Sequence, residues 1–162
     1  FEFLMAAEIL KGKANFILCG DLDYEAKDFI KLESINYWIK NSIIEYIGYE
    51  NDMHKIISKA NIVVLPSYRE GLPKVLSEAA ACGIPVITTN VPGCRDAILN
   101  NKTGLLVNSE KEWFLALKKL IENKKLRKRM SNNGIYHVRR NFSVKVNKDR
   151  YLKIFNNLTN KN

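Results

Sequence analysis

The chain has 162 residues, a length that suits one compact domain able to bury a substantial core. Hydrophobic residues make up 46% and charged residues 27%, which excludes a disordered protein, and no apolar run approaches the roughly 20 residues of a membrane-spanning helix. The net charge of +9 is uneven: residues 1–110 carry 11 Lys/Arg and 14 Asp/Glu, a net of −3, whereas residues 111–162 carry 15 Lys/Arg and 3 Asp/Glu, a net of +12. The basic character therefore lies in the last third.

Short apolar runs alternate with longer amphipathic stretches through the first two thirds of the chain. The apolar runs are rich in β-branched residues and nearly continuous, which is typical of strands covered on both faces. Their alternation with helical segments predicts right-handed crossovers and an α/β fold with a Rossmann-like, doubly wound parallel sheet. In chain order the predicted elements are helix 1–11, strand 14–19, helix 25–39, strand 43–47, helix 52–59, strand 61–65, helix 73–82, strand 85–89, a short helical turn near 94–99 and strand 104–107.

The last third of the chain is predicted to be helical. Ser109 and Glu112, three residues apart, form a capping box that opens a helix with Trp113 and Leu117 on one face. No proline follows Pro92, so the remainder can form two or three helices. We therefore expect a single domain over residues 1–162, with a basic helical tail from about residue 109.

The cysteines and histidines do not form a metal-binding pattern. Cys19, Cys82 and Cys94 are odd in number and scattered, and His54 and His137 are isolated. We interpret the cysteines as small residues of a reduced, cytoplasmic protein, and we expect no metal site.

The most informative segment begins where strand 61–65 ends. Pro66 terminates the strand, Gly71 permits close backbone approach, and Pro73 suits the first position of a helix. In open α/β sheets, ligands bind beyond the carboxyl ends of the strands, and the free amides of a helix start can receive a phosphate. The segment is consistent with an anion-binding turn or with a purely structural helix start.

Two carboxylates, Glu70 and Glu78, flank this turn. A carboxylate would repel a phosphate, whereas it accepts short, strong hydrogen bonds from paired sugar hydroxyls. A nucleotide sugar lying across the helix start would suit both glutamates, although a glutamate on a helix is more often simply solvated.

The segment from Pro66 to Val107 resembles the donor-binding C-terminal domain of retaining glycosyltransferases of the GT-B fold, of the group 1 or family 4 type. This large family includes sucrose synthase-like, bacterial polysaccharide and lipid-linked oligosaccharide transferases. Its hallmark is a Glu, seven residues and a second Glu, which Glu70 and Glu78 match. The ordered context makes the resemblance specific: Ala60-Asn61, Ala79 to Val86, Val91 to Ile98 and Asn101 to Val107 also match.

The resemblance implies a catalytic-site role for Glu70, which would contact the hydroxyls of the donor sugar, whereas Glu78 would contact the ribose hydroxyls. The amides of Gly71 and Leu72, just before Pro73, would lie against the sugar and the diphosphate. It also implies that the base is held near residues 44–46.

Tyr46 is therefore a candidate binding residue, as is Gly20, which ends the strand 14–19 beside the same crevice. The family type implies no metal and no cofactor. The donor would be a UDP-sugar, and a hexose or N-acetylhexosamine would pass with retention of configuration to a glycan or a polyprenyl-linked acceptor.

The sequence also departs from the family pattern. An Arg and a Lys that stabilise the leaving nucleoside diphosphate in the family would precede Phe1, as would the acceptor-binding N-terminal domain. The first strand of this domain would also precede Phe1 and would lie between the strands 14–19 and 61–65. We therefore expect a piece of a longer protein that is inactive alone, and a nucleotide-sugar-binding module without turnover is the alternative.

Seven Lys/Arg residues lie between residues 118 and 129. They are consistent with a solvated helix face, with attachment to an anionic membrane surface, or with nucleic-acid binding. No nucleic-acid-binding motif accompanies the charge, so we expect no nucleic-acid partner. The membrane interpretation would place a cytoplasmic protein on the inner face of the plasma membrane.

Overall fold

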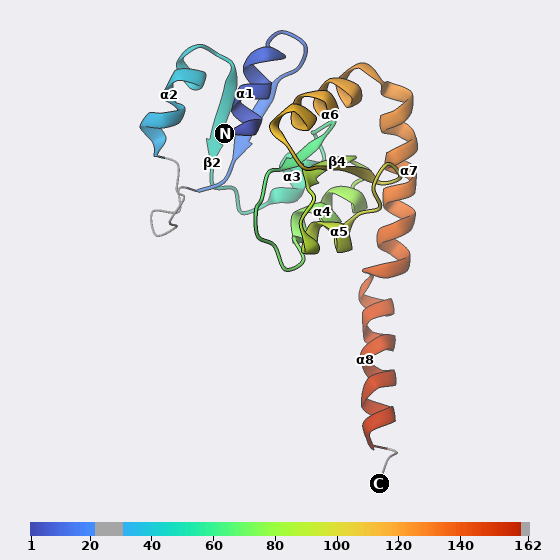
Figure 1. Cartoon of the computed structure of the whole chain (residues 1–162). Helices are drawn as coiled ribbons and strands as arrows, with labels where there is room; N and C mark the ends of the chain where they lie inside the picture. The colour runs from blue at the N-terminus through green and yellow to red at the C-terminus, as the bar shows by residue number, and fades with distance from the viewer. Residues whose placement is uncertain (22–30, 160–162) are drawn as a thin grey trace.

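The computed structural model describes residues 1–21 and 31–159 and shows an α/β body from which the C-terminal helix extends (Figure 1). The strands are β1 (Phe16–Cys19), β2 (Ile44–Gly48), β3 (Val63–Leu65), β4 (Val86–Thr89) and β5 (Gly104–Val107). The helices are α1 (Glu2–Ile9), α2 (Leu32–Lys40), α3 (Met53–Ile57), α4 (Lys74–Ala81), α5 (Pro92–Ala97), α6 (Glu110–Glu122), α7 (Lys124–Asn141) and α8 (Val144–Thr159).

The order and type of these elements confirm the predicted α/β fold. Each predicted strand is present, with its start displaced by two residues or fewer. Of the predicted helix 25–39, the part up to residue 30 lies outside the described residues, and α2 begins at Leu32. Pro73 is the cap residue before α4 and not its first helical residue, because its ψ of 114° is extended.

All described strand pairs are parallel, but they form two sheets and not one. β1 pairs with β2, and a second sheet has the order β3-β4-β5. Within the described residues, β1 and β3 are not hydrogen-bonded to each other. The predicted additional strand would belong between them, and it stays a prediction.

The three-stranded sheet is covered on both faces, as a doubly wound architecture requires. Ile87 and Leu105 belong to the larger core, which also contains buried side chains from α1, α2, α6 and the two-stranded sheet. Their neighbours Val86 and Leu106 point the other way, into a core that they share with α3, α4 and α5. This alternation follows from the period of two along a strand.

The predicted capping box is present at the start of α6. The Ser109 hydroxyl accepts the amide of Glu112 at 3.4 Å, while the Glu112 carboxylate accepts the amide of Asn108 at 2.7 Å. Trp113, Leu117 and Leu120 are consequently directed into the core.

Three helices form the predicted basic tail, and they differ in how they are held. α6 lies beside α1, and α7 packs against α4 (Figure 1). α8 continues away from the body and has no buried residue. None of the helices in the described residues has the length and apolarity needed to cross a membrane.

Candidate functional site

The structure places the candidate loop between β3 and α4. β3 ends at Leu65, and α4 starts at Lys74 after the extended Pro73. Pro73 makes no side-chain cap, and among the described residues the amides of Lys74 and Val75 have no hydrogen-bond partner, whereas that of Leu76 donates to the carbonyl of Pro73 at 3.2 Å. The helix dipole adds partial positive charge there, which makes this helix start suited to an anion.

The two glutamates lie on either side of this helix start. Glu70 is partly buried in the loop, and Glu78 is exposed on the second turn of α4. Gly71 and Leu72 between them are exposed, while Pro73 is buried. Carboxylates thus lie before and beyond the open amides.

Glu70 also acts on the buried residues below the loop. Burial raises the pKa of the Cys94 thiol, and the negative charge of Glu70 raises it further, although a hydrogen bond from Thr88 opposes both effects. The Glu70 backbone lies beside α5, because its carbonyl oxygen would be 2.5 Å from a Cβ atom on Gly93 in the first turn of that helix.

The two other candidate residues, Gly20 and Tyr46, contact each other. The Tyr46 hydroxyl donates to the carbonyl of Gly20 at 3.1 Å, and the Gly20 amide donates to the carbonyl of Gly48 at 2.9 Å. Gly20 directly follows β1, whereas Tyr46 is the middle residue of β2 and reaches the end of β1 through its side chain. Among the described residues, no hydrogen bond joins this pair to the Glu70 loop.

A cavity of about 170 Å³ lies at the carboxyl ends of the three-stranded sheet. Its lining includes Pro66, Tyr68, Thr89 and Trp113, together with Glu2 of α1. The Tyr68 hydroxyl donates a hydrogen bond to the Glu2 carboxylate. Burial alone raises the pKa of Glu2, but hydrogen bonds, foremost that from Tyr68, hold it below its ordinary value.

Sequence analysis did not assign a role to Glu2 or Tyr68. Tyr68 lies within the motif segment, but Glu2 is 66 residues away in the chain. Only tertiary structure brings this carboxylate to the edge of the sheet.

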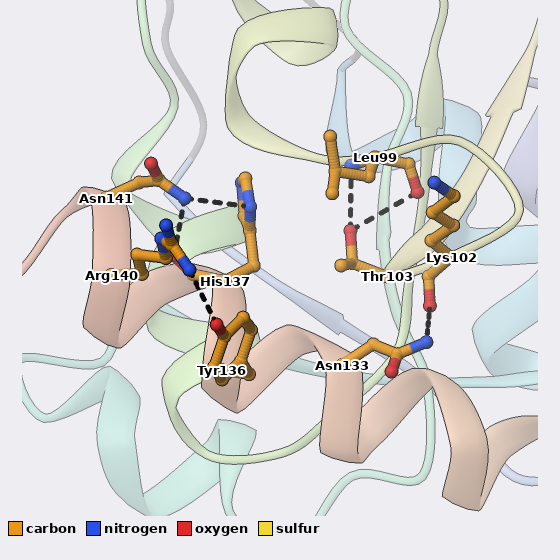
Figure 2. Close-up of a pocket in the computed structure, with 8 residues that line it drawn as sticks. All are labelled: Leu99, Lys102, Thr103, Asn133, Tyr136, His137, Arg140 and Asn141. Carbon is orange, nitrogen blue, oxygen red and sulfur yellow. Dashed lines mark hydrogen bonds between the residues drawn. The ribbon is translucent and has the colours of Figure 1, made fainter.

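A larger cavity, of about 360 Å³, lies between the loop that precedes β5 and helix α7 (Figure 2). None of the candidate residues lines it. Several of its polar groups are engaged with one another: Asn133 donates to the carbonyl of Lys102, Arg140 to the hydroxyl of Tyr136, and Thr103 bonds the backbone of Leu99. The buried Nε2 atom of His137, in the same lining, has no hydrogen-bond partner among the described residues. We therefore interpret it as part of the contact that fixes α7 on the body.

The described residues contain no cluster of three or more His, Cys, Asp or Glu side chains that could hold a metal ion.

The family described as "Glycosyl transferases group 1" matches residues 1–137. The chain belongs to this family. It is 33% identical over 156 residues to the N,N'-diacetylbacillosaminyl-diphospho-undecaprenol alpha-1,3-N-acetylgalactosaminyltransferase of Campylobacter jejuni, with coverage of 95% of this chain and 40% of that protein. It is 31% identical to the capsular polysaccharide biosynthesis glycosyltransferase CapM of Staphylococcus aureus, with coverage of 90% and 39%. The chain thus spans about two fifths of the length of each relative.

Among solved structures, Anabaena HepE in complex with UDP superposes with a TM-score of 0.84. The match covers 96% of this chain and 44% of that chain at 19% identity, which shows the fold alone. The recognition of a C-terminal domain of a GT-B, group 1 glycosyltransferase is confirmed. The roles of Glu70, Glu78, Gly71, Leu72, Pro73, Gly20 and Tyr46 stay predictions.

Proposed function

We propose that the whole protein transfers a hexose or an N-acetylhexosamine from a UDP-sugar to a glycan or a polyprenyl-linked acceptor with retention of configuration, and that this chain supplies the donor site. The carrying observation is the Glu70–Gly71 loop, which ends at the uncapped start of α4, with Glu78 on that helix. Two comparisons support the donor and the acceptor: HepE has been solved with UDP and with UDP-glucose, and the Campylobacter relative is named for a diphospho-undecaprenol acceptor.

The proposed roles come from the family resemblance, and the positions of the groups are consistent with them. The open amides of α4 and those of Gly71 and Leu72 face the diphosphate, where they stabilise the charge that develops on the leaving UDP. Glu70, before the helix, accepts hydrogen bonds from the sugar hydroxyls, and Glu78, one turn into the helix, accepts them from the ribose.

The base would lie at the carboxyl ends of β1 and β2. A hydrogen bond joins Gly20 there to the side chain of Tyr46. No metal ion or cofactor is needed in this scheme, and we expect EDTA to leave donor binding unchanged.

The donor site can be tested by calorimetric titration of UDP into the protein with and without Glu78→Ala. We expect the substitution to weaken binding about tenfold or more, because hydrogen bonds to a charged acceptor are lost. Glu122→Ala is the matched control: this exposed helical glutamate forms only a surface ion pair with Lys13 at 3.5 Å, and its removal should leave binding unchanged. No UDP binding by the wild-type protein would refute the proposed donor site.

Turnover is a separate question from binding. The test assays transfer from a UDP-sugar by the chain alone and by the chain joined to a family N-terminal half. Transfer by the joined protein would exclude the binding-module alternative, and UDP binding without transfer by both proteins would support it. The isolated chain is expected to bind and not to turn over.

We also propose that residues 118–129 attach the protein to an anionic membrane surface, where a polyprenyl-linked acceptor would be found. The Arg127 guanidinium is held against the end of α6, where it donates to the carbonyls of Leu120 and Ile121. Lys119, Lys124, Lys125, Lys128 and Arg129 are exposed. Co-sedimentation should increase with the fraction of anionic lipid in the vesicles, and equal binding to neutral vesicles would contradict the proposal.

A further inference from the structure

Gly93, in the first turn of α5, is packed against the main chain of the donor loop. A Cβ atom at this position would lie 2.1 Å from the carbonyl oxygen of Gly71 and 2.5 Å from that of Glu70. Both atoms belong to the backbone, so no side-chain rotation could relieve the overlap. The start of α5 is therefore in direct contact with the two residues that carry the proposed sugar contacts.

The requirement for glycine at this position is one of space and not of backbone conformation. Gly93 is helical and is not among the described glycines with positive φ. In a helix, alanine is more favourable than glycine by about 1 kcal/mol. The residue best suited to the helix is thus excluded only by the approach of the Glu70–Gly71 backbone.

A buried polar pair ties the same region to the sheet. Thr88 and Cys94 are both 0% exposed, and the Thr88 hydroxyl lies 3.1 Å from the Cys94 sulfur. The hydroxyl also donates to the carbonyl of Leu65 at 2.9 Å, where β3 ends and the loop begins. β4 and α5 thereby hold the chain at Leu65, directly before the loop, and again at Glu70–Gly71.

We infer that Gly93, together with the Thr88–Cys94 pair, positions the donor loop and so sets where the Glu70 carboxylate meets the sugar. This inference rests on the proposed function, in which Glu70 contacts the sugar. Gly93, Thr88 and Cys94 are positioning residues: they act through the backbone of Glu70 and Gly71, and they are buried beneath it.

The test compares Gly93→Ala with Gly104→Ala in the full chain. Gly104, at the start of β5, is a matched control, because a Cβ atom there would also meet main chain, 2.5 Å from the carbonyl oxygen of Val86. Both substitutions should lower stability. Only Gly93→Ala should increase amide hydrogen exchange in the peptide covering residues 66–73 relative to the rest of the chain.

Ligand affinities supply a second readout, measured with UDP and with UDP-glucose, UDP-galactose and their N-acetylamino forms. The preference is the ratio of the Kd for UDP to the Kd for the best-bound UDP-sugar. Gly93→Ala should reduce this ratio by about tenfold, because a hydrogen bond from the sugar to the charged Glu70 is lost. Gly104→Ala should leave that preference unchanged.

Milder substitutions keep the test decisive if Gly93→Ala does not fold. Thr88→Val removes the hydroxyl at nearly constant shape and should change exchange and affinity in the same direction by a smaller factor, whereas Thr88→Ser keeps the hydroxyl and should restore both. The inference would be overturned if amide hydrogen exchange in residues 66–73 were the same in Gly93→Ala, Thr88→Val and Gly104→Ala. If the wild-type chain binds no UDP, the proposed function fails, while the exchange comparison still decides whether Gly93 positions the loop.

Discussion

Helices α7 and α8 follow each other in the chain, and both are basic, yet only α7 is anchored. Met130 of α7 is 1% exposed, and Gly134 lies against Ala80 of α4. α8 buries nothing among the described residues, and Tyr151 and Phe155 are among its exposed apolar side chains. Helices gain most of their stability from tertiary packing. The contrast shows that α7 belongs to the folding unit of the donor site, whereas α8 does not contribute to it.

Of the substitutions that test the difference between α7 and α8, Met130→Ala should change the free energy of unfolding most. Removing a fully buried side chain leaves a cavity where α7 meets the main core, and such changes cost about 2–5 kcal/mol. Denaturant unfolding of the variant should show this loss of stability. Asn132→Ala, at an exposed position on the same helix, is the control and should change little. A loss below about 1 kcal/mol for Met130→Ala would show that α7 is not an integral part of the domain.

A smaller effect of opposite sign is expected from Gly134→Ala. A Cβ atom there would lie 3.4 Å from the Cβ atom of Ala80, which is ordinary contact, and alanine favours the helix by about 1 kcal/mol. The midpoint of thermal unfolding should therefore rise. Gly134→Leu should lower it, because the larger side chain cannot fit between α7 and α4. If both substitutions lowered the midpoint, α7 and α4 would pack more closely than the 3.4 Å distance at Gly134 indicates.

The sequence predicted the strands and the candidate loop because their signals are local. Apolar β-branched runs, the Pro66 and Pro73 boundaries and the interval between Glu70 and Glu78 are all visible without tertiary information. The capping box at Ser109 was predicted for the same reason, and its hydrogen bond is present.

The missed features depend on contacts between distant segments. Gly93 looks like an ordinary residue of a Pro-Gly turn until the Glu70–Gly71 backbone is seen against it. Glu2 reaches Tyr68 only in the folded chain. The separation of β1 from β3, in contrast, agrees with the strand order that the family resemblance implied, whereas no local pattern reports which neighbours a strand will have.

The smallest effect is expected from Phe155→Ser on α8. Phe155 is 61% exposed, and α8 has no buried residue, so the substitution removes almost no burial from the described residues. The free energy of unfolding of the chain should change by no more than about 0.5 kcal/mol, as for most exposed positions. Denaturant unfolding of Phe155→Ser and Met130→Ala under the same conditions compares how much α8 and α7 contribute to stability. A loss for Phe155→Ser that approaches the loss for Met130→Ala would show that α8 packs on the body in solution, and the anchored and unanchored helices would no longer differ.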